Sequence, residues 1–430
     1  MNRKVSICMP VIRVEQSLKC IEAILENVGI PHEDYEIVTA IDYERIGFPL
    51  MFKNLVERAK YDLICLLADD TFPKKDFLKI ALDEMDKLPD GWGVVGFNSD
   101  GNDHAHFLAD RRMEQFIEDG DLYSTEYEHC FGDDELKDIA IEQGRWAYAE
   151  DAVVEHRHPM FGTAKSDEDY DNAYNDGKFF RDRETYLCRR IDRTLKNKGP
   201  LIAVAFPLTD LKVYTHFMFS FLRMDKPANY CIFMPNYPGP VDVIRNELVK
   251  QAFQASCTHI LMMDTDQIYS DRDMIARMMA HDKPVVGARV HRRYPPFDPL
   301  TLRGTVGKFK PVPDVEIEAA MKNGNPLVKV DATGCGCVLY SMKVFAKIHD
   351  PWFELDTNKD TKMPIGEDIA FCMKLAQHGI DIFVDCSIDI KHLTLHATDW
   401  NTWKVWQKIE GAKFGANLKP QQSEVNQNGT

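Results

Sequence analysis

Residues 259–268, HILMMDTDQI, form an apolar run that ends abruptly in Asp264, Thr265 and Asp266. Such a run predicts a buried parallel strand, and residues just past the carboxyl end of that strand face the ligand crevice of an open α/β sheet. Ionised aspartates are rarely buried without a partner, so two at this place favour a hard divalent cation such as Mg²⁺ or Mn²⁺. The alternative is that they only cap a helix expected to begin near Ser270.

The same arrangement occurs earlier in the chain. The run YDLICLLADD (61–70) ends in Asp69 and Asp70, and the opening strands VSICMPV (5–11) and LIAVAFPL (201–208) share a strand-then-proline pattern. Strands alternate with helical segments of about ten residues or more, which predicts a doubly wound, mostly parallel sheet in each half. The sequence therefore predicts an α/β protein with an internal duplication of a whole domain.

Four segments follow from this pattern. We expect an N-terminal domain at 1–164, a charged helical linker at 165–199, a C-terminal domain at 200–415 and a disordered tail at 416–430. The arginines of the linker, Arg189, Arg190 and Arg193, are interpreted as a solvated helix face. A second basic group, Arg289, Arg292 and Arg293, follows the DTD strand, where a phosphate could reach it. Trp400, Trp403 and Trp406 are interpreted as packing against the second domain.

The composition limits the function classes. The chain has 430 residues, 44% hydrophobic and 28% charged, and a net charge of −16, which argues against a broad nucleic-acid surface. Its eleven cysteines lie in apolar surroundings, which suits reduced thiols. The sequence has neither a run of about 18 apolar residues nor a signal-peptide core. We therefore expect a cytoplasmic protein, in the host cytoplasm if it is phage-encoded, with no transmembrane segment.

A second pattern also recurs in the same order in both halves. A Gly-acid-Asp sequence opens a helix at Gly132-Asp133-Asp134 and again at Gly366-Glu367-Asp368, and each helix is followed by a strand that ends in a histidine, His156 or His392. Each feature alone is an ordinary helix cap or core histidine. Together they supply what group transfer from a phosphate leaving group needs, which is a metal held by Asp and His and a separate carboxylate base.

These motifs resemble a known family. VSICMPV, YEIVTAID, YDLICLLADDTFP, GDDELKDIAIEQG and VVEHRHP are similar to the successive motifs of inverting, family-two-like glycosyltransferases of the GT-A fold. In the second half, THILMMDTDQIYS, DATGCGCVLYSMKVF and PIGEDIAFCMKLAQHGIDIFVD resemble a bacterial and phage branch of the same superfamily. The resemblance covers nearly the whole chain as two tandem units and implies a metal-dependent transferase acting on a UDP- or GDP-sugar.

The resemblance assigns roles residue by residue in the second half. Asp266 is the expected principal metal ligand, with Asp264 contacting the metal or the nucleotide ribose, and His392 is the third metal-side ligand, with His396 as the fallback. Asp368 is the expected catalytic base, flanked by Glu367. The positions expected to bind the nucleotide are Pro207, Thr209, Arg245 and Asn246.

In the first half, Asp70 and His156 are the expected metal ligands and Asp134 the expected base. Pro10, Asp42 and Asp69 are the positions expected to contact the nucleotide. The first half departs from the family pattern at Ala68, where the leading Asp of a DxD motif would stand. We therefore expect the C-terminal half to be the active transferase and the N-terminal half to be a second transferase.

The same motifs are compatible with other functions. One half could be a catalytically dead module that binds sugar or acceptor. DTDQI also nearly matches the nucleophile motif of haloacid-dehalogenase-type phosphatases, and a nucleotidyltransferase could use a related α/β fold. The acceptor is left open among a glycan, a protein, a lipid carrier and a modified nucleic-acid base.

Overall fold

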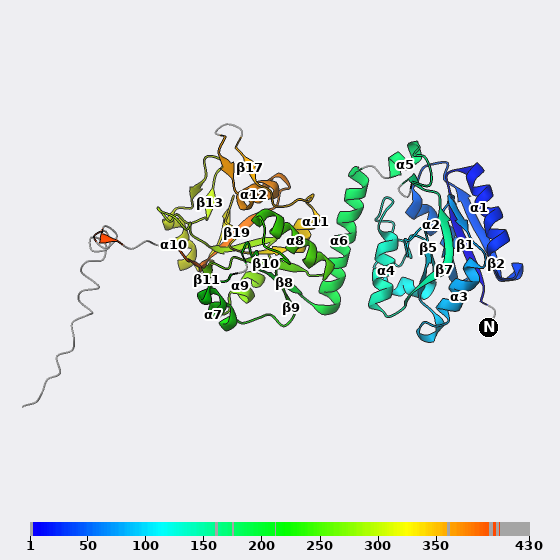
Figure 1. Ribbon diagram of the computed structural model, residues 1–430, viewed down its shortest axis with the longest axis horizontal. Helices are drawn as coiled ribbons and strands as arrows, with labels where there is room; N and C mark the ends of the chain where they lie inside the picture. The colour runs from blue at the N-terminus through cyan, green and yellow to red at the C-terminus, as the bar shows by residue number, and fades with distance from the viewer. Residues whose placement is uncertain are drawn as a thin grey trace, which may run out of the picture.

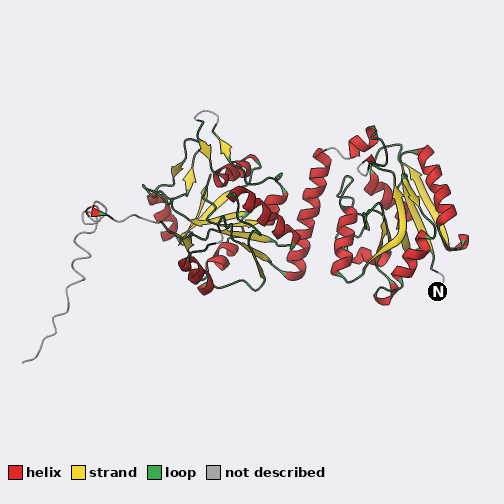
Figure 2. Ribbon diagram, viewed as in Figure 1, coloured by secondary structure: helices red, strands yellow, loops and turns green. Residues whose placement is uncertain are grey.

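The computed structural model describes residues 3–159, 162–173, 176–210, 212–358, 362–394, 399–400 and 404. Two seven-stranded sheets dominate it, each flanked by helices, and one long helix, α6, runs between them (Figures 1 and 2). His396, Trp403, Trp406 and the tail 416–430 lie outside the described residues. In the described part of the chain, no helix is both long and apolar enough to cross a membrane.

The first sheet is mixed, and its strand order is β2-β1-β3-β6-β5-β7-β4. Five strands run in one direction, and β6 and β4 are antiparallel to their neighbours. Its strands are β1 (Val5–Val11), β2 (Tyr35–Ile41), β3 (Leu63–Leu66), β4 (Thr71–Pro73), β5 (Val94–Asn98), β6 (Phe107–Asp110) and β7 (Trp146–His156).

The second sheet has the order β15-β19-β12-β16-β10-β8-β9, again with five strands in one direction. Its strands are β8 (Ile202–Ala205), β9 (Tyr230–Phe233), β10 (His259–Met263), β12 (Val285–Arg289), β15 (Leu327–Val330), β16 (Cys337–Ser341) and β19 (Ile382–Asp389). Short two-stranded pairs add β11 (Gln267–Ile268) with β20 (Lys391–His392), β13 (Leu302–Arg303) with β14 (Lys310–Pro311), and β17 (Asp356–Thr357) with β18 (Pro364–Ile365).

The two sheets repeat one topology. Read from one edge, β2-β1-β3-β6-β5-β7 corresponds strand by strand to β9-β8-β10-β16-β12-β19, with the one antiparallel strand at the same place. In each half, a short strand directly after the acidic strand end pairs antiparallel with the segment that carries the histidine, through Thr71 opposite His156 and Gln267 opposite His392. Both histidines are thereby brought to the acidic strand end.

Strand burial explains why these apolar runs become central strands. In β3, Leu63 and Cys65 pack into the core on one face of the sheet, whereas Ile64 and Leu66 pack into the core on the other. In β10, Met262 and Met263 likewise divide between two cores. A strand buried on both faces needs helices on both sides, and Figure 2 shows helices flanking each sheet. The carboxyl ends of these strands are therefore free to form the site.

The helices around the first sheet are α1 (Val14–Asn27), α2 (Phe48–Arg58), α3 (Phe77–Met85) and α4 (Gly132–Glu142), with short 3₁₀ turns at His32–Asp34, Pro89–Gly91 and Arg111–Phe116. Those around the second are α7 (Thr215–Arg223), α8 (Val241–Gln254), α9 (Met274–Ala280), α10 (Asp314–Lys322), α11 (Met342–Ala346) and α12 (Glu367–Gln377). The additional length of the second half forms β13, β14, α10 and β15.

The linker segment forms α5 (Glu168–Ala173) and α6 (Asp176–Lys198), and α6 packs against both α4 and α11. The interpretation of its arginines as a solvated face is wrong. Arg189 is 7% exposed and pairs with Glu135 of α4 at 2.9 Å, and Arg193 contacts the same carboxylate at 3.3 Å. On the side of the second half, Lys343 of α11 pairs with Asp192 at 2.6 Å. Arg189 and Arg193 therefore bind an acidic partner instead of water.

Candidate active site

The carboxyl ends of β1, β2 and β3 open into a cavity of about 300 Å³ in the first half. All six residues expected to form a site in this half line that cavity, and they come from four strand ends and the start of α4: Pro10, Asp42, Asp69, Asp70, Asp134 and His156. Strand order explains the convergence, because parallel strands bring their carboxyl ends to one edge of the sheet.

Asp70 and His156 lie together at the bottom of this site. His156 Nε2 is 3.2 Å from Asp70 Oδ1, and the Tyr170 hydroxyl donates to Asp70 Oδ2 at 2.8 Å. Burial by itself raises the pKa of Asp70, but the imidazole and the hydroxyl outweigh it and hold the pKa at about 2. Asp70 is therefore a buried carboxylate that stays ionised, as a metal ligand must.

Asp42 and Asp69 are held by backbone amides. Asp69 accepts from the N–H groups of Ile12 and Arg13 at 2.7 and 2.6 Å, and Asp42 accepts from those of Ile46 and Gly47 at 2.9 and 3.0 Å. These bonds fix the loops that leave β1 and β2 at the rim of the cavity. The two carboxylates thus shape the rim of this cavity.

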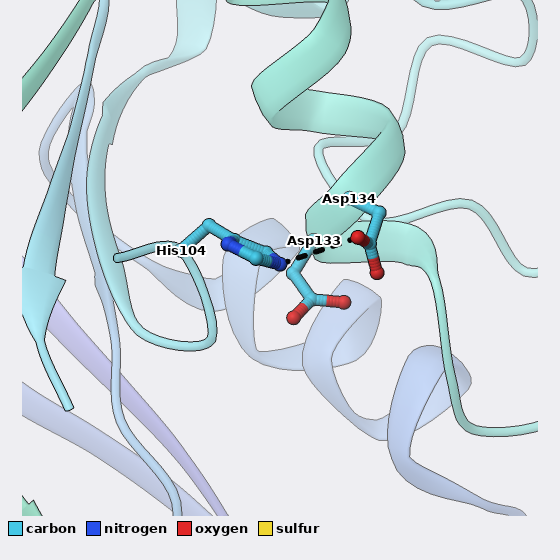
Figure 3. Close-up of side chains that lie close together, drawn as sticks. All are labelled: His104, Asp133 and Asp134. Atoms are coloured by element: carbon cyan, nitrogen blue, oxygen red, sulfur yellow. Dashed lines mark ion pairs between the residues drawn. The ribbon is translucent and has the colours of Figure 1, made fainter. Parts of the chain in front are cut away.

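On the side of α4, the cavity is lined by His104, Asp133 and Asp134 (Figure 3). Their ligand atoms lie within 4.8 Å of one another, with His104 Nε2 3.2 Å from Asp134 Oδ1. Burial lowers the pKa of His104, but the Asp134 and Asp133 carboxylates raise it to about 9. Burial and the Asp134 charge raise the pKa of Asp133 to about 6.

Sequence reasoning missed several residues of this site. His104 lies in an irregular polar segment whose sequence pattern does not predict a site residue. Tyr170 comes from α5, 100 positions after its partner Asp70. The Tyr170 ring is covered by the Arg13 guanidinium at 3.8 Å, and Arg13 Nε also pairs with Asp167 at 3.2 Å. Two further buried histidines, His106 and His158, line the cavity, where burial lowers their pKa values to about 3 and 4.

In the second half, Asp266 and His392 meet in the same way. His392 Nε2 lies 3.4 Å from Asp266 Oδ2, and Arg293 forms an ion pair with the same carboxylate. His392 Nδ1 is 2.8 Å from the carbonyl of His291. When Nδ1 donates to that carbonyl, Nε2 of the neutral ring carries the lone pair on the side of Asp266. The orientation therefore suits a metal-binding imidazole.

A buried arginine organises the other carboxylates. Arg245, on α8, is 3% exposed and contacts Asp264 at 3.0 Å and Glu367 at 3.3 Å. Arg245 thus neutralises acidic side chains of its own chain, and Glu367 is one of its partners. Burial, together with the Asp266 charge, still raises the pKa of Asp264 against the effect of Arg245.

Asp368 begins α12 beside this arginine cluster. Burial and the neighbouring Glu367 raise the pKa of Asp368 to about 6, although the Ile369 N–H donates to its Oδ1 at 2.7 Å. Gly334 and Gly366 pass close to its oxygens, because a Cβ at either position would lie 3.7 or 2.8 Å from them. A carboxylate with a raised pKa beside ionised neighbours has the properties of a general base.

The other residues expected to bind the nucleotide differ in what they contact within the chain. The Asn246 amide accepts from the N–H groups of Trp352 and Phe353 and donates to the carbonyls of Asp242 and Phe353, which uses its whole hydrogen-bonding capacity. Asn246 therefore fixes the backbone at 352–353, and its contact with a nucleotide stays a prediction. Pro207 is buried just after β8, and Thr209 is exposed two residues later.

The donor sets in both halves fit a divalent cation. Each offers an ionised aspartate and an imidazole on a short antiparallel pairing. The neighbouring carboxylates are held by other groups, Asp69 by the amides of Ile12 and Arg13 and Asp264 by Arg245. Carboxylate oxygen and imidazole nitrogen together suit Mn²⁺, and Mg²⁺ prefers the carboxylates. Asp70 with His156, and Asp266 with His392, would hold the ion.

Comparison with known proteins gives limited matches. The family model described as Anp1 matches residues 242–300, which contain the DTD strand. No curated protein gives a match. Among solved structures, "Crystal Structure of A197 from STIV" is 14% identical, covering 46% of this chain and 97% of that chain, with a TM-score of 0.30.

Two other solved structures are similar over the same share of the chain. TarS 1–349 from S. aureus is 11% identical, covering 45% of this chain and 72% of that chain, with a TM-score of 0.33. The mannosyltransferase PcManGT from Pyrobaculum calidifontis, in complex with GDP-Man and Mn²⁺, is 13% identical, covering 46% and 66%, with a TM-score of 0.35.

Proposed function

We propose that this protein is a metal-dependent, inverting glycosyltransferase built from two tandem GT-A-like units, with limits near 1–164 and 200–415. One observation carries the proposal. Two sheets of the same strand order each place a strand-end aspartate beside a histidine, Asp70 with His156 at 3.2 Å and Asp266 with His392 at 3.4 Å. Each sheet also has an acidic helix start in the same unit, at Asp134 and at Asp368.

In the second half, the proposed base is Asp368. It takes the proton from an acceptor hydroxyl, whose oxygen attacks the anomeric carbon of a UDP- or GDP-sugar from the face opposite the diphosphate. The bond to the diphosphate breaks and the configuration inverts. A divalent cation at Asp266 and His392 would supply the positive charge that stabilises the leaving diphosphate. Arg245 holds Asp264 and Glu367 in place beside this chemistry.

The first half is proposed as a second transferase unit, with Asp134 as its base. Its cavity of about 300 Å³ supports this role, because that volume is of the size that holds a small ligand. Two observations favour the second candidate, a sugar- or acceptor-binding module without transfer activity. Tyr170 donates to Asp70, and His104 pairs with Asp134, so both functional carboxylates already have partners within the chain.

The proposal is tested by incubating the purified chain with a panel of UDP- and GDP-sugars and measuring Mn²⁺-dependent release of the nucleotide. We expect release of at least one nucleotide, which a chelator abolishes and excess Mn²⁺ restores. In a chain that already carries Asp70→Asn in the first half, Asp266→Asn should lower this activity by about 10²-fold or more, because the carboxylate that holds the second-half metal is gone.

Asp225→Asn is the matched control, because Asp225 is an exposed aspartate of the same half, paired with Arg272 on the surface. It should retain wild-type release. A chain whose release survives the chelator, or an Asp266→Asn variant as active as Asp225→Asn when both carry Asp70→Asn, would contradict the metal-dependent mechanism. Retained release in an Asp70→Asn variant would favour the binding-module reading of the first half.

A further inference from the structure

A cation of the chain itself lies on the proposed metal ligands of the second half. Arg293 extends from the loop between β12 and β13, forms an ion pair with Asp266, and places Nε 3.4 Å from His392 Nε2. Both of its partners are the residues that would hold the metal. The guanidinium and a divalent cation therefore compete for the same carboxylate.

Arg293 differs from the other arginine of this site in exposure. The Arg293 side chain is 43% exposed, whereas that of Arg245 is 4% exposed. Exposed ion pairs contribute little to stability, so Arg293 can leave Asp266 at low cost, whereas Arg245 cannot leave its buried carboxylates. The site thus contains one buried cation, Arg245 on α8, and one half-exposed cation, Arg293 on a loop.

We propose that Arg293 is an exchangeable counter-ion, which occupies Asp266 and His392 until the metal arrives and then turns to the diphosphate of the nucleotide. This inference rests on the proposed function. Metal binding neutralises Asp266 and releases the guanidinium next to the ion, where a nucleoside diphosphate would bring several negative charges. A guanidinium binds phosphate oxygens through two parallel N–H bonds, so its new partner is as favourable as the old one.

The first half has no such exchange among its described residues. In the place that Arg293 takes in the second half, the Tyr170 hydroxyl donates to Asp70 beside His156. This hydroxyl is neutral, and the Tyr170 ring is buried and covered by Arg13. We therefore assign the exchange to the second half alone. This difference allows a test in the full chain, because a change at Arg293 should alter only the site that contains Asp266.

The test compares wild type with Arg293→Gln, Asp266→Asn and a matched control, Arg272→Gln. Arg272 is an exposed arginine of the same half, and it pairs with Asp225 on the surface. Mn²⁺ alone is titrated by following free Mn²⁺ in electron paramagnetic resonance, and preformed Mn²⁺ complexes of UDP and of GDP are titrated by calorimetry. The Mn²⁺ bound by wild type but not by Asp266→Asn belongs to the second-half site.

We expect Arg293→Gln to bind Mn²⁺ alone about five-fold more tightly than wild type, because the competing cation is gone. The ratio of its affinity for the preformed complex to its affinity for Mn²⁺ alone should fall about ten-fold, because the phosphate contact is lost. Arg272→Gln should leave both quantities at wild-type values. A residue that only supported the loop would weaken both.

Unchanged Mn²⁺ affinity in Arg293→Gln would overturn the exchange while leaving the metal site intact, provided that Asp266→Asn loses that Mn²⁺. Tighter Mn²⁺ binding with an unchanged ratio would overturn the contact with the diphosphate. Equal Mn²⁺ binding by wild type and Asp266→Asn would overturn the metal site itself, and with it this inference.

Discussion

Replacing Asp368 by asparagine is expected to lower sugar transfer by the second half about 10²- to 10⁴-fold, measured in a chain whose first half carries Asp70→Asn, with nucleotide binding retained. Asparagine keeps the shape of the side chain and the oxygen that accepts from the Ile369 N–H, but it cannot accept the proton of the acceptor hydroxyl. Because burial raises the pKa of Asp368 to about 6, wild-type transfer should also fall as the pH drops below about 6. Initial rates from pH 5 to 8, with nucleotide affinity by calorimetry, measure both effects.

The same substitution should stabilise the fold at neutral pH. The folded-state pKa of about 6 lies above the ordinary value of 3.8, so the ionised form is disfavoured in the folded protein. The protonated side chain of Asp368 favours folding below about pH 4, and this contribution to the free energy of unfolding is lost as the pH rises through 6. The free energy of unfolding of Asp368→Asn should therefore exceed that of wild type by up to about 3 kcal/mol at pH 7.5 and by little at pH 4.

The control for this result is Asp381→Asn, because Asp381 is an exposed aspartate that pairs with Lys329. Its free energy of unfolding should follow that of wild type at both pH values within about 1 kcal/mol. In the chain that carries Asp70→Asn, an Asp368→Asn change that leaves the rate of sugar transfer unaltered would remove Asp368 from the mechanism. A variant that is inactive but less stable than wild type at pH 7.5 would show that the carboxylate supports structure instead.

Replacing Arg245 by glutamine is expected to destabilise the protein by about 3 kcal/mol or more at pH 7.5. Arg245 is buried and compensates Asp264 and Glu367, so glutamine would leave those carboxylates without a positive charge. The pKa values of Asp264 and Asp368 are already raised by burial and would rise further without Arg245. Denaturant unfolding as a function of pH measures the loss.

The pH dependence separates this effect from simple loss of packing. Carboxylates with raised folded-state pKa values favour folding when protonated, so the deficit of Arg245→Gln should shrink as the pH falls towards 4. Arg272→Gln is the matched control, since the Arg272–Asp225 pair at 2.7 Å is exposed on both sides and should matter by less than about 1 kcal/mol. A deficit of equal size at all pH values would contradict the electrostatic role of Arg245.

The sequence predicted the strand ends well, because apolar runs such as HILMM and LICLL specify central strands and the acidic residues follow them directly. The order of motifs also predicted that Asp266 meets His392 and Asp70 meets His156, as the structure shows. That success has a topological cause, since each histidine-bearing segment pairs with the short strand after the aspartates.

The partners supplied by loops and by the linker could not be predicted. Arg293 reaches Asp266 from an irregular loop, and Tyr170 reaches Asp70 across 100 positions of sequence, so no periodic pattern marks either contact. The arginines of α6 were misread for a related reason. A charged helix face looks solvated in sequence, and only tertiary packing reveals that Glu135 of α4 binds Arg189.

Counting the Mn²⁺ ions bound by the full chain tests whether each half holds a metal. We expect two ions per chain at saturation, one lost in Asp266→Asn, the other lost in Asp70→Asn, and both lost in the double variant, with each variant shown to be folded by circular dichroism. A wild-type chain that binds no Mn²⁺, or a double variant that binds as many ions as wild type, would contradict this expectation.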